Sequence, residues 1–473
     1  MVPLTVDLDG TLLQTDVFYE SILMVLRENP LNLFRLPFWA LQGKAALKKQ
    51  LADRVSFDPA SLPYNNKVLD WLKSQKAMGR TLILCTGADE TIARLIAAYL
   101  GLFDDVMASD GKTNLSRANK ANALVARFGE KGFDYVGNES ADFPVWKKAR
   151  SAIVVNTSPR FIEKARQCSP VEMVFSVPPP SFSTWMRMLR VHQWVKNVLL
   201  FVALAAAHRL GDVHHDLLLL AAFLSFSLCA SAVYITNDLL DLDSDRLHAK
   251  KCHRPFASGR VPVLMGMLFV PILFFVSIGL GLCVNGDFVA CLIVYSILTT
   301  AYSFRLKKLL LLDCFVLSAL YTLRIVAGGV AAEVNLSFWL LAFSIFLFLS
   351  LAFVKRFAEI HTRKDCSMIR GRGYQTSDAS LIQTLGVTAG FSSVLVLAFY
   401  LNSDAVIKLY RSPEWVWGAV FVMLFWISWI WMQSARGKMH DDPVIFALKD
   451  RISIFSGCIF LLALYFATIG FSW

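Results

Sequence analysis

ITNDLLDLDSDRLHAKKCHRP, residues 235–255, ends a long apolar segment and decides how most of this chain folds. The stretch contains the pattern NDxxDxxxD, in which the aspartates are three and four residues apart. This spacing places the polar residues on one face of a helix: Asn237, Asp238, Asp241 and Asp245. Three carboxylates at a membrane boundary repel one another unless divalent cations lie between them. Mg²⁺ prefers carboxylates together with substrate phosphates, so we predict that the three aspartates bind Mg²⁺ and that the asparagine contacts substrate. The alternative is a solvated helix end that carries a run of charges.

Basic residues follow the acidic pattern directly, and they include Lys251 and Arg254. A cation-rich loop beside carboxylates that bind a metal predicts a site for a diphosphate. Other polar residues interrupt the apolar segments on both sides of this loop. We expect them to hold phosphates or to contact substrate at the same site: Lys196, Tyr302, Lys307, Asp313, Arg324 and Lys355.

Arg324 lies inside an otherwise apolar segment, on the helix face that also carries Asp313 and Tyr321. An ionisable residue inside the membrane is a functional hypothesis by default. The alternative is a structural ion pair between Arg324 and Asp313. A further acidic pair, Asp441 and Asp442, is expected to form a polar lid or an anchor for the N-terminal domain.

The composition of the chain places most of it in lipid. Of 473 residues, 56% are hydrophobic and 18% are charged, and the mean hydropathy is +0.51. These values exclude a disordered chain, a collagen and a small disulfide scaffold. The net charge of +11 would suggest nucleic acid as a partner of a soluble protein, but in a membrane protein it indicates cytoplasmic loops and anionic lipid. We therefore predict the lipid bilayer, and no nucleic acid, as a partner.

The apolar segments predict an all-α polytopic membrane domain. We expect nine transmembrane helices, at residues 195–211, 214–237, 262–284, 287–304, 310–331, 336–354, 382–402, 414–433 and 453–471. With the N-terminal residues inside the cell, the loops on that side contain 18 Lys and Arg residues, against 3 on the other side. Positive residues accumulate on the cytoplasmic side, so we predict a cytoplasmic N-terminal domain, cytoplasmic active sites and an external C-terminus.

Residues 1–176 have the pattern of a soluble, doubly wound α/β domain. Short apolar runs predict buried parallel strands with helices between them: LTVDLDG, TLILCTG, FDYVGNE, SAIVVNT and VEMVFS. An insert of about 60 residues between the first two strands is helical in period and predicts a cap over a site. Its FRLPFWAL stretch, residues 34–41, is suited to a membrane surface. Residues 177–186, with three consecutive prolines, predict a linker to the membrane domain at 187–473.

Polar residues follow the predicted strands of this domain at the points where chemistry is expected. Asp7 and Asp9 come directly after the first strand, so that one carboxylate can attack phosphorus and the other can protonate the leaving oxygen. Thr86 ends the next strand, where its hydroxyl is suited to hold a phosphate oxygen, and Lys120 is suited to neutralise the charge of the transferred group. Mg²⁺ is predicted to bind beside these groups, with ligands from Asp7, Asp9, Asn138 and Asp142. The alternative is a degenerate domain with a purely structural role.

These motifs carry two resemblances. From about Arg187 onward the chain resembles the UbiA-type intramembrane prenyltransferase superfamily, and within it the decaprenyl-phosphate phosphoribosyltransferase branch. The stretches that match are LRVHQWVKN (189–197), the acidic motif with its basic loop (237–255), YSFRLKK (302–308) and LRIVAGG (323–329). Aromatic prenyltransferases of that superfamily carry a second motif of the DxxxD type, whereas here Asp313 is followed four positions later by Leu317. This departure disfavours a site in which two acidic motifs bind the diphosphate of one prenyl substrate.

The first 176 residues resemble the haloacid dehalogenase phosphatase superfamily, because DxDGT, a threonine, a lysine and GNxxxD occur in that order. The resemblance implies that Asp7 is the nucleophile and that Asp9 is the general acid and base. The family pattern GDxxxD has become GNxxxD, so the neutral Asn138 replaces a charged metal ligand.

Together the two resemblances imply a bifunctional enzyme of the bacterial inner membrane. It would transfer 5-phosphoribose from phosphoribosyl pyrophosphate (PRPP) to a polyprenyl phosphate, and would then remove the 5-phosphate. The alternative is an aromatic prenyltransferase that uses a prenyl diphosphate and carries a regulatory or structural N-terminal domain. A carrier or channel with a regulatory domain is a third hypothesis, because nine helices can form either.

Overall fold

The computed structural model describes residues 2–156, 158–208, 211–361, 373–401, 410–439 and 442–470, so the predicted acidic residue Asp441 lies outside the described residues. The chain forms two compact units. The first contains Met1–Arg190 and Tyr234–Ile272, and the second contains Val191–Val233 and Leu273–Trp473.

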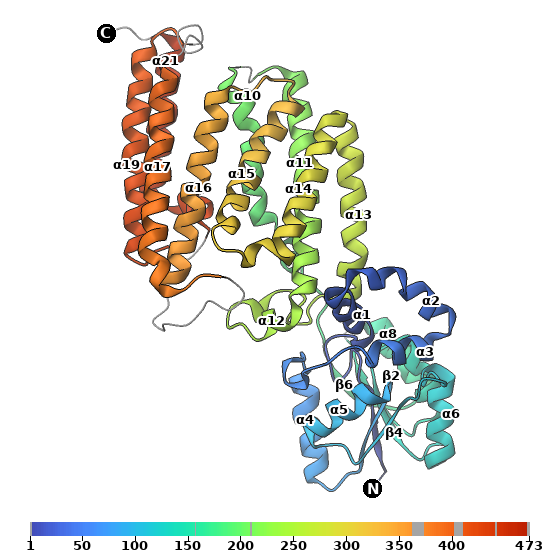
Figure 1. Cartoon of the computed structure of the whole chain (residues 1–473). Helices are drawn as coiled ribbons and strands as arrows, with labels where there is room; N and C mark the ends of the chain where they lie inside the picture. The colour runs from blue at the N-terminus through green and yellow to red at the C-terminus, as the bar shows by residue number, and fades with distance from the viewer. Residues whose placement is uncertain are drawn as a thin grey trace. The chain divides into compact units, whose positions relative to one another are not determined.

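The first unit contains a parallel six-stranded sheet with the strand order β3-β2-β1-β4-β5-β6, as the predicted α/β class requires (Figure 1). Its strands are β1 (Leu4–Val6), β2 (Leu82–Asp89), β3 (Asp105–Ser109), β4 (Asp134–Gly137), β5 (Ala152–Val155) and β6 (Val171–Phe175). Strand β3 was not among our predictions, because its residues, DVMAS, are mostly half-buried at the edge of the sheet and form no continuous apolar run.

Helices connect the strands and form the predicted insert. The connecting helices are α4 (Asn66–Ala77), α5 (Glu90–Leu100), α6 (Arg117–Phe128), α7 (Phe143–Lys148) and α8 (Pro159–Cys168). The insert between β1 and β2 contains α1 (Val17–Glu28), a 3₁₀ helix (Pro30–Phe34), α2 (Leu36–Leu41) and α3 (Lys44–Ala52). Helix α1 begins at an N-cap, because the Asp16 carboxylate accepts the backbone N–H of Phe18 at 2.9 Å.

The order of the strands determines where this sheet can hold a ligand. β1 pairs with both β2 and β4, and Val6 is in register with Leu84 and Val136. The chain therefore leaves β1 toward one side of the sheet and reaches β4 on the other side. In open α/β sheets ligands bind at such a switch point, beyond the carboxyl ends of the strands. The loops after β1 and β4 lie at this point.

The rest of the first unit includes α9 (Phe182–Met188), the end of α11 (Val213–Leu240), α12 (Leu242–Arg246) and the start of α13 (Val263–Leu282). We expected the acidic motif to lie on one straight helix, but the helix is interrupted within the motif. Helix α11 ends at Leu240, and the ψ angle of Asp241 is 13°, outside the helical range. Helical hydrogen bonds nevertheless continue across this bend, from Asp241 N–H to Asn237 O at 3.0 Å and from Asp245 N–H to Asp241 O at 2.8 Å.

The second unit is a bundle of long apolar helices. After the start of α11 it contains α14 (Gly286–Phe304), α15 (Leu312–Ala331), α16 (Phe338–His361), α17 (Ala379–Leu401), α19 (Val416–Ala435), α20 (Pro443–Lys449) and α21 (Arg451–Ile469). Helix α16 packs between α15 and α17, and α19 packs against α17 and α21 (Figure 1). Small residues permit this close approach. A Cβ on Gly390 would lie 2.7 Å from Ile427 and 2.8 Å from the Ser350 hydroxyl.

Within the described residues, eight helices are long and apolar enough to cross a membrane. We predicted nine, and the first of them, at residues 195–211, is the one that differs. Residues 195–211 do not form a long helix. Instead, a 3₁₀ helix (Val191–Phe201) leads into the short helix α10 (Val202–Ala206). Lys196 and Asn197 are buried in this segment and bind polar groups of the same unit. The packing of Val191–Ala206 thus depends on polar contacts, which cannot be predicted from mean hydropathy.

Candidate active sites

The loop after β1 presents the DxDGT carboxylates at the switch point of the sheet. Asp7 donates its backbone N–H to Val136 O of β4 at 3.0 Å, and the Asp9 carboxylate accepts the N–H of Val17 at 2.9 Å. Gly10 allows the turn, since its φ is +70° and the Asn138 side chain occupies the place of a Cβ. The loop is therefore held between β4 and the start of α1.

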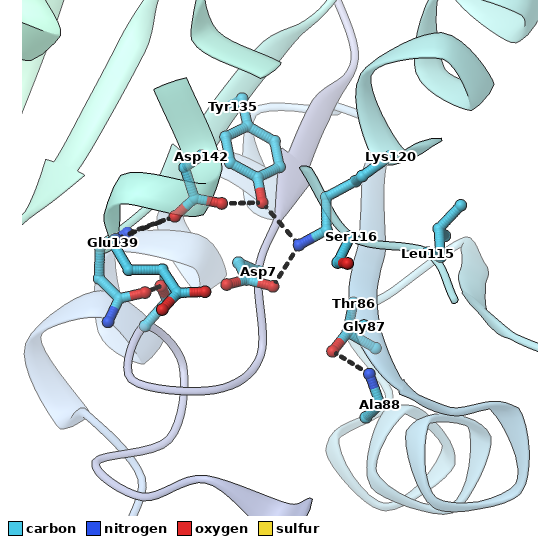
Figure 2. A network of polar contacts seen from close by, with 12 residues as sticks. Asp7, Thr86, Gly87, Ala88, Leu115, Ser116, Lys120, Tyr135, Glu139 and Asp142 are labelled. Carbon is cyan, nitrogen blue, oxygen red and sulfur yellow. Dashed lines mark hydrogen bonds and ion pairs between the residues drawn. The ribbon is translucent and has the colours of Figure 1, made fainter. Parts of the chain in front are cut away.

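A buried polar network joins three of the predicted residues (Figure 2). Lys120, from α6, donates to Asp7 Oδ1 at 2.7 Å and to the Tyr135 hydroxyl at 2.9 Å. The Tyr135 hydroxyl in turn donates to Asp142 Oδ1 at 2.8 Å. Tyr135 was not predicted, because inside the strand FDYVGNE it is indistinguishable from a core aromatic residue.

The electrostatics of this network follow from its burial. Burial raises the pKa of Asp7 to about 7, against the lowering effect of the Lys120 ammonium. Burial also raises the pKa of Asp9 well above its usual value, and the nearby Asp16 carboxylate adds to the shift. Burial lowers the pKa of Lys120, but the carboxylates of Asp7 and Asp142 outweigh it and raise the pKa above its usual value. Excess negative charge of this kind is what a bound cation would compensate.

The remaining predicted residues of this site have distinct contacts. Thr86 is buried, and its hydroxyl accepts the Ala88 N–H at 3.0 Å (Figure 2). A hydroxyl that accepts one hydrogen bond can still donate its own hydrogen. Asn138 Oδ1 accepts the Thr11 hydroxyl at 3.0 Å. Both oxygens of Asp142 are engaged, because Oδ2 accepts the N–H groups of Asn138 and Glu139 at 2.9 and 3.0 Å. Asp142 thus holds the loop after β4 through its carboxylate.

The oxygen donors of this site suit Mg²⁺ only in part. Within the described ranges, no group of three or more His, Cys, Asp and Glu side chains gathers as a metal site. Asp7 and Asp9 each use one carboxylate oxygen in the hydrogen bonds above, and their other oxygens and the Asn138 amide are hard donors. Such a set fits Mg²⁺ when water and a substrate phosphate complete the coordination.

The insert contributes a cation that the sequence did not lead us to expect. Lys48, on α3, donates to the Gly87 carbonyl and, at 3.1 Å, to Asn114 Oδ1, and it lies 6.0 Å from the ring of Phe18. Burial lowers the pKa of Lys48, although the Asp9 carboxylate opposes this shift. An ammonium group from the insert therefore lies beside the end of β2, next to Thr86.

In the same unit, the acidic motif and its basic loop come together. Arg254 Nη1 bridges two carboxylates, Asp238 Oδ1 at 3.0 Å and Asp245 Oδ2 at 2.5 Å. Arg190 also pairs with Asp238, and its guanidinium lies 5.1 Å from the ring of Tyr234. Arg190 lies in the LRVHQWVKN stretch, but a single arginine before an apolar segment gave no signal by itself.

The other members of the acidic motif are more accessible. Asn237 and Asp241 are half-buried, and Lys251 Nζ lies 3.8 Å from Asp245 Oδ1. Burial raises the pKa of Asp245, although the Arg254 charge opposes the shift. Asp245 Oδ1 is buried without a hydrogen-bond partner among the described residues. An orphaned carboxylate oxygen fits a cation ligand, so this site, too, is chemically suited to Mg²⁺ together with a ligand phosphate.

In the second unit, Asp442 lies between two of the predicted phosphate-binding lysines. Its Oδ2 accepts Lys196 Nζ at 2.9 Å and Lys355 Nζ at 3.2 Å, and its Oδ1 accepts the Tyr321 hydroxyl at 3.0 Å. Although burial acts in the other direction, the ammonium groups of Lys355 and Lys196 hold the pKa of Asp442 well below its usual value. We had expected a lid or an anchor here, and its contacts in this unit make it the counter-ion of both lysines.

Arg324 is buried among polar and aromatic side chains of the second unit. It donates to Asn197 Oδ1 at 3.0 Å and to the Tyr295 hydroxyl at 3.2 Å, and its guanidinium lies 5.0 Å from the Tyr295 ring. The ion pair with Asp313 that we considered is wrong, because eleven residues of helix separate the two by about 16 Å along α15. Asp313 forms its ion pair with the fully buried Arg356, at 2.5 Å.

The last two predicted residues lie at the end of α14. Tyr302 is in its final turn, and Lys307 is in the 3₁₀ turn Leu306–Lys308 that follows. Both are half-buried.

Comparison with known proteins identifies the helical part of the chain. The UbiA prenyltransferase family matches residues 198–444. The uncharacterised protein y4nM of Sinorhizobium fredii is 39% identical over 466 residues, which cover 97% of this chain and 89% of that protein. Decaprenyl-phosphate phosphoribosyltransferase of Mycobacterium tuberculosis is 32% identical over 310 residues, which cover 63% of this chain and 97% of that enzyme.

Among solved structures, a UbiA homologue from Archaeoglobus fulgidus bound to GPP and Mg²⁺ aligns with a TM-score of 0.44 and 16% identity. It covers 60% of this chain and 99% of that chain. The family match and the relatives in sequence, rather than this distant likeness, decide the classification. The chain, with its multi-pass helical unit, belongs to the UbiA prenyltransferase family.

Proposed function

We propose that this chain transfers 5-phosphoribose from PRPP to a polyprenyl phosphate, and that its N-terminal domain then removes the 5-phosphate. The observation that carries the proposal is that basic side chains, rather than a second acidic motif, accompany the carboxylates in both units. A transfer between two phosphorylated substrates needs cations for two separate anions. The relative from M. tuberculosis, named for such a transfer, supports the same class of reaction.

In the transfer, an ionised oxygen of the polyprenyl phosphate attacks the anomeric carbon of PRPP. The bond from that carbon to the pyrophosphate oxygen breaks, and pyrophosphate leaves with the bonding electrons, so no general base is required. Mg²⁺ bound at Asp238, Asp241 and Asp245 would neutralise charge on the leaving group. Arg254 pairs with Asp238 and Asp245, and Arg190 pairs with Asp238, so these two guanidinium groups are expected to hold the pyrophosphate.

The second anion is assigned to Lys196 and Lys355. Asp442 balances both ammonium groups, so a phosphate of the acceptor lipid that replaces this carboxylate would find two cations and the Tyr321 hydroxyl already arranged. Arg324 donates to Asn197 Oδ1, to the Tyr295 hydroxyl and to the Leu320 carbonyl, and its guanidinium is a further cation of this unit that can bind the same anion.

In the N-terminal domain, Asp7 Oδ2 attacks the phosphorus of the 5-phosphate while Lys120 holds Oδ1. The bond from phosphorus to the ribose oxygen breaks, and Asp9 gives that oxygen its proton. Water then attacks the aspartyl phosphate, loses a proton to Asp9 and releases inorganic phosphate. We place both sites on the cytoplasmic side of a bacterial inner membrane, because loops rich in Lys and Arg belong on that side, so that the product of the transfer can become the substrate of the phosphatase.

The test uses the purified protein in detergent with Mg²⁺, PRPP and a polyprenyl phosphate, and identifies the lipid products by mass spectrometry. We expect a dephosphorylated ribosyl lipid from the wild type and its 5-phosphate from Asp7→Asn. Asp70→Asn, an exposed aspartate of the same domain, should behave like the wild type. If both the wild type and Asp7→Asn stop at the 5-phosphate, the phosphatase half of the proposal is wrong. If no ribosylated lipid forms but an aromatic acid is prenylated from a prenyl diphosphate, the alternative function is correct.

A further inference from the structure

An exposed apolar patch lies on the insert of the first unit. Its five large side chains lie within eleven positions, on the 3₁₀ helix Pro30–Phe34 and on α2, and their exposed fractions range from 56% to 85%: Leu31, Leu33, Phe34, Phe38 and Leu41. We call these residues the cap patch. Single exposed apolar residues are common on protein surfaces, but a contiguous group of this size marks an interaction site.

The insert is otherwise well packed, so the cap patch is not the result of a poorly folded segment. Helix α1 buries Val17, Leu23 and Val25, and α3 buries Leu51 and Ala52. Helix α2, which lies between them in sequence, buries none of its residues. The insert therefore presents one apolar segment outward while its neighbours complete the core.

The charge around the cap patch indicates its partner. Residues 29–52 contain four basic side chains, Arg35, Lys44, Lys48 and Lys49, and no Asp or Glu. Of these, Arg35 and Lys44 are exposed, whereas Lys48 contacts Gly87 and Asn114 and Lys49 pairs with Asp53. An apolar surface with exposed basic neighbours is complementary to a membrane with anionic head groups, and leucine and phenylalanine are residues that insert into such a boundary. The described residues of the same chain include eight helices that are long and apolar enough to cross a membrane, so the protein is attached to a bilayer.

We propose that the cap patch binds the surface of the bilayer, with its leucine and phenylalanine side chains among the head groups of anionic lipids. A lipid surface needs no shaped pocket on the protein, which agrees with apolar side chains that project from two short helical turns. This inference concerns a binding surface and does not depend on the proposed reactions.

The test places a photoreactive benzoylphenylalanine at position 38 of the full-length protein, reconstituted in nanodiscs that contain either anionic phosphatidylglycerol or only phosphatidylcholine. Position 78 is the matched control, because Met78 is 56% exposed in the same unit but lies at the C-cap of α4. After irradiation, intact-mass spectrometry measures adducts with lipid and with protein. We expect a several-fold excess of lipid adduct at position 38 over position 78, and more adduct with phosphatidylglycerol.

Equal lipid adducts at the two positions would overturn the proposal, and so would a predominant adduct with a second copy of the chain. A second measurement uses the unmodified protein, so that it does not depend on the substitution. Backbone hydrogen exchange at residues 31–42 should slow in phosphatidylglycerol nanodiscs relative to detergent, whereas exchange in α4 should not change. No slowing at residues 31–42 would contradict the proposal.

Discussion

Replacing Lys120 with methionine tests whether the ammonium group compensates the buried carboxylates of the N-terminal domain. The substitution keeps a side chain of similar length and removes the charge that bonds Asp7 at 2.7 Å and Tyr135 at 2.9 Å. The Lys120 and Asp7 side chains are only 6% and 7% exposed. Loss of one partner of a buried ion pair costs about 3–5 kcal/mol, because the other charge remains without compensation.

We expect a loss near the lower end of this range. Burial already raises the pKa of Asp7 to about 7, so in the variant this carboxyl can bind a proton and relieve part of the penalty. A loss of about 3 kcal/mol corresponds to a decrease of roughly 160-fold in the protection of backbone amides that exchange by opening of this domain. Hydrogen exchange of peptides from β1 and α6, in the full-length protein without added Mg²⁺, measures this change.

Two comparisons make the result decisive. Lys73→Met removes a lysine whose ion pair with Asp70 is exposed, and it should change the same protection by less than about 1 kcal/mol. In an Asp7→Asn background, Lys120→Met should have a smaller effect, because no carboxylate is left unpaired. If Lys120→Met alters protection no more than Lys73→Met does, our account of this network is wrong.

Three further predictions address the other sites. Arg254→Gln should reduce pyrophosphate release from PRPP by about 10²-fold, because one guanidinium bridges two carboxylates of the acidic motif, and an unchanged rate would exclude Arg254 from substrate binding. Lys48→Ala should raise the KM for hydrolysis of a phosphate monoester several-fold, whereas Lys49→Ala, which removes the contacts of an exposed side chain with Asp53, Thr91 and Asp89, should not, and equal KM values would refute a role for the insert. Gly390→Leu should lower the thermal unfolding temperature in detergent, because its Cβ would lie 2.7 Å from another helix, whereas Gly457→Leu, with nothing within 4 Å, should not.

The replacement of the family aspartate by Asn138 has a structural counterpart. The Asn138 side chain lies where Gly10 has no Cβ, and it accepts the Thr11 hydroxyl, so it helps to hold the DxDGT loop. Its amide oxygen remains a hard donor, although it brings no charge. The asparagine is therefore compatible with the loop geometry, and its effect is expected on metal affinity rather than on the fold.

Sequence patterns were sufficient where one segment carries its own signal. Five of the six strands, the helical insert and all the long membrane helices were predicted, because a buried strand or a lipid-facing helix must be apolar along its own length. The edge strand β3 was not predicted, because it is only half-buried. The structure of the segment Val191–Ala206 was not predicted either, because it depends on the polar contacts of Lys196 and Asn197.

The candidate sites divide in the same way. The candidate residues could be selected from the sequence alone, because aspartates after a strand and an NDxxDxxxD motif at a helix end are unusual patterns. Several of their partners are evident only in the fold: Tyr135 for Asp142, Arg190 for Asp238, Asp442 for Lys196 and Arg356 for Asp313. Arg190 is 48 positions from Asp238, and Asp442 is 246 positions from Lys196 in the sequence. Which faces of distant elements meet depends on the packing of the whole unit, and no local pattern of charge or hydropathy contains that information.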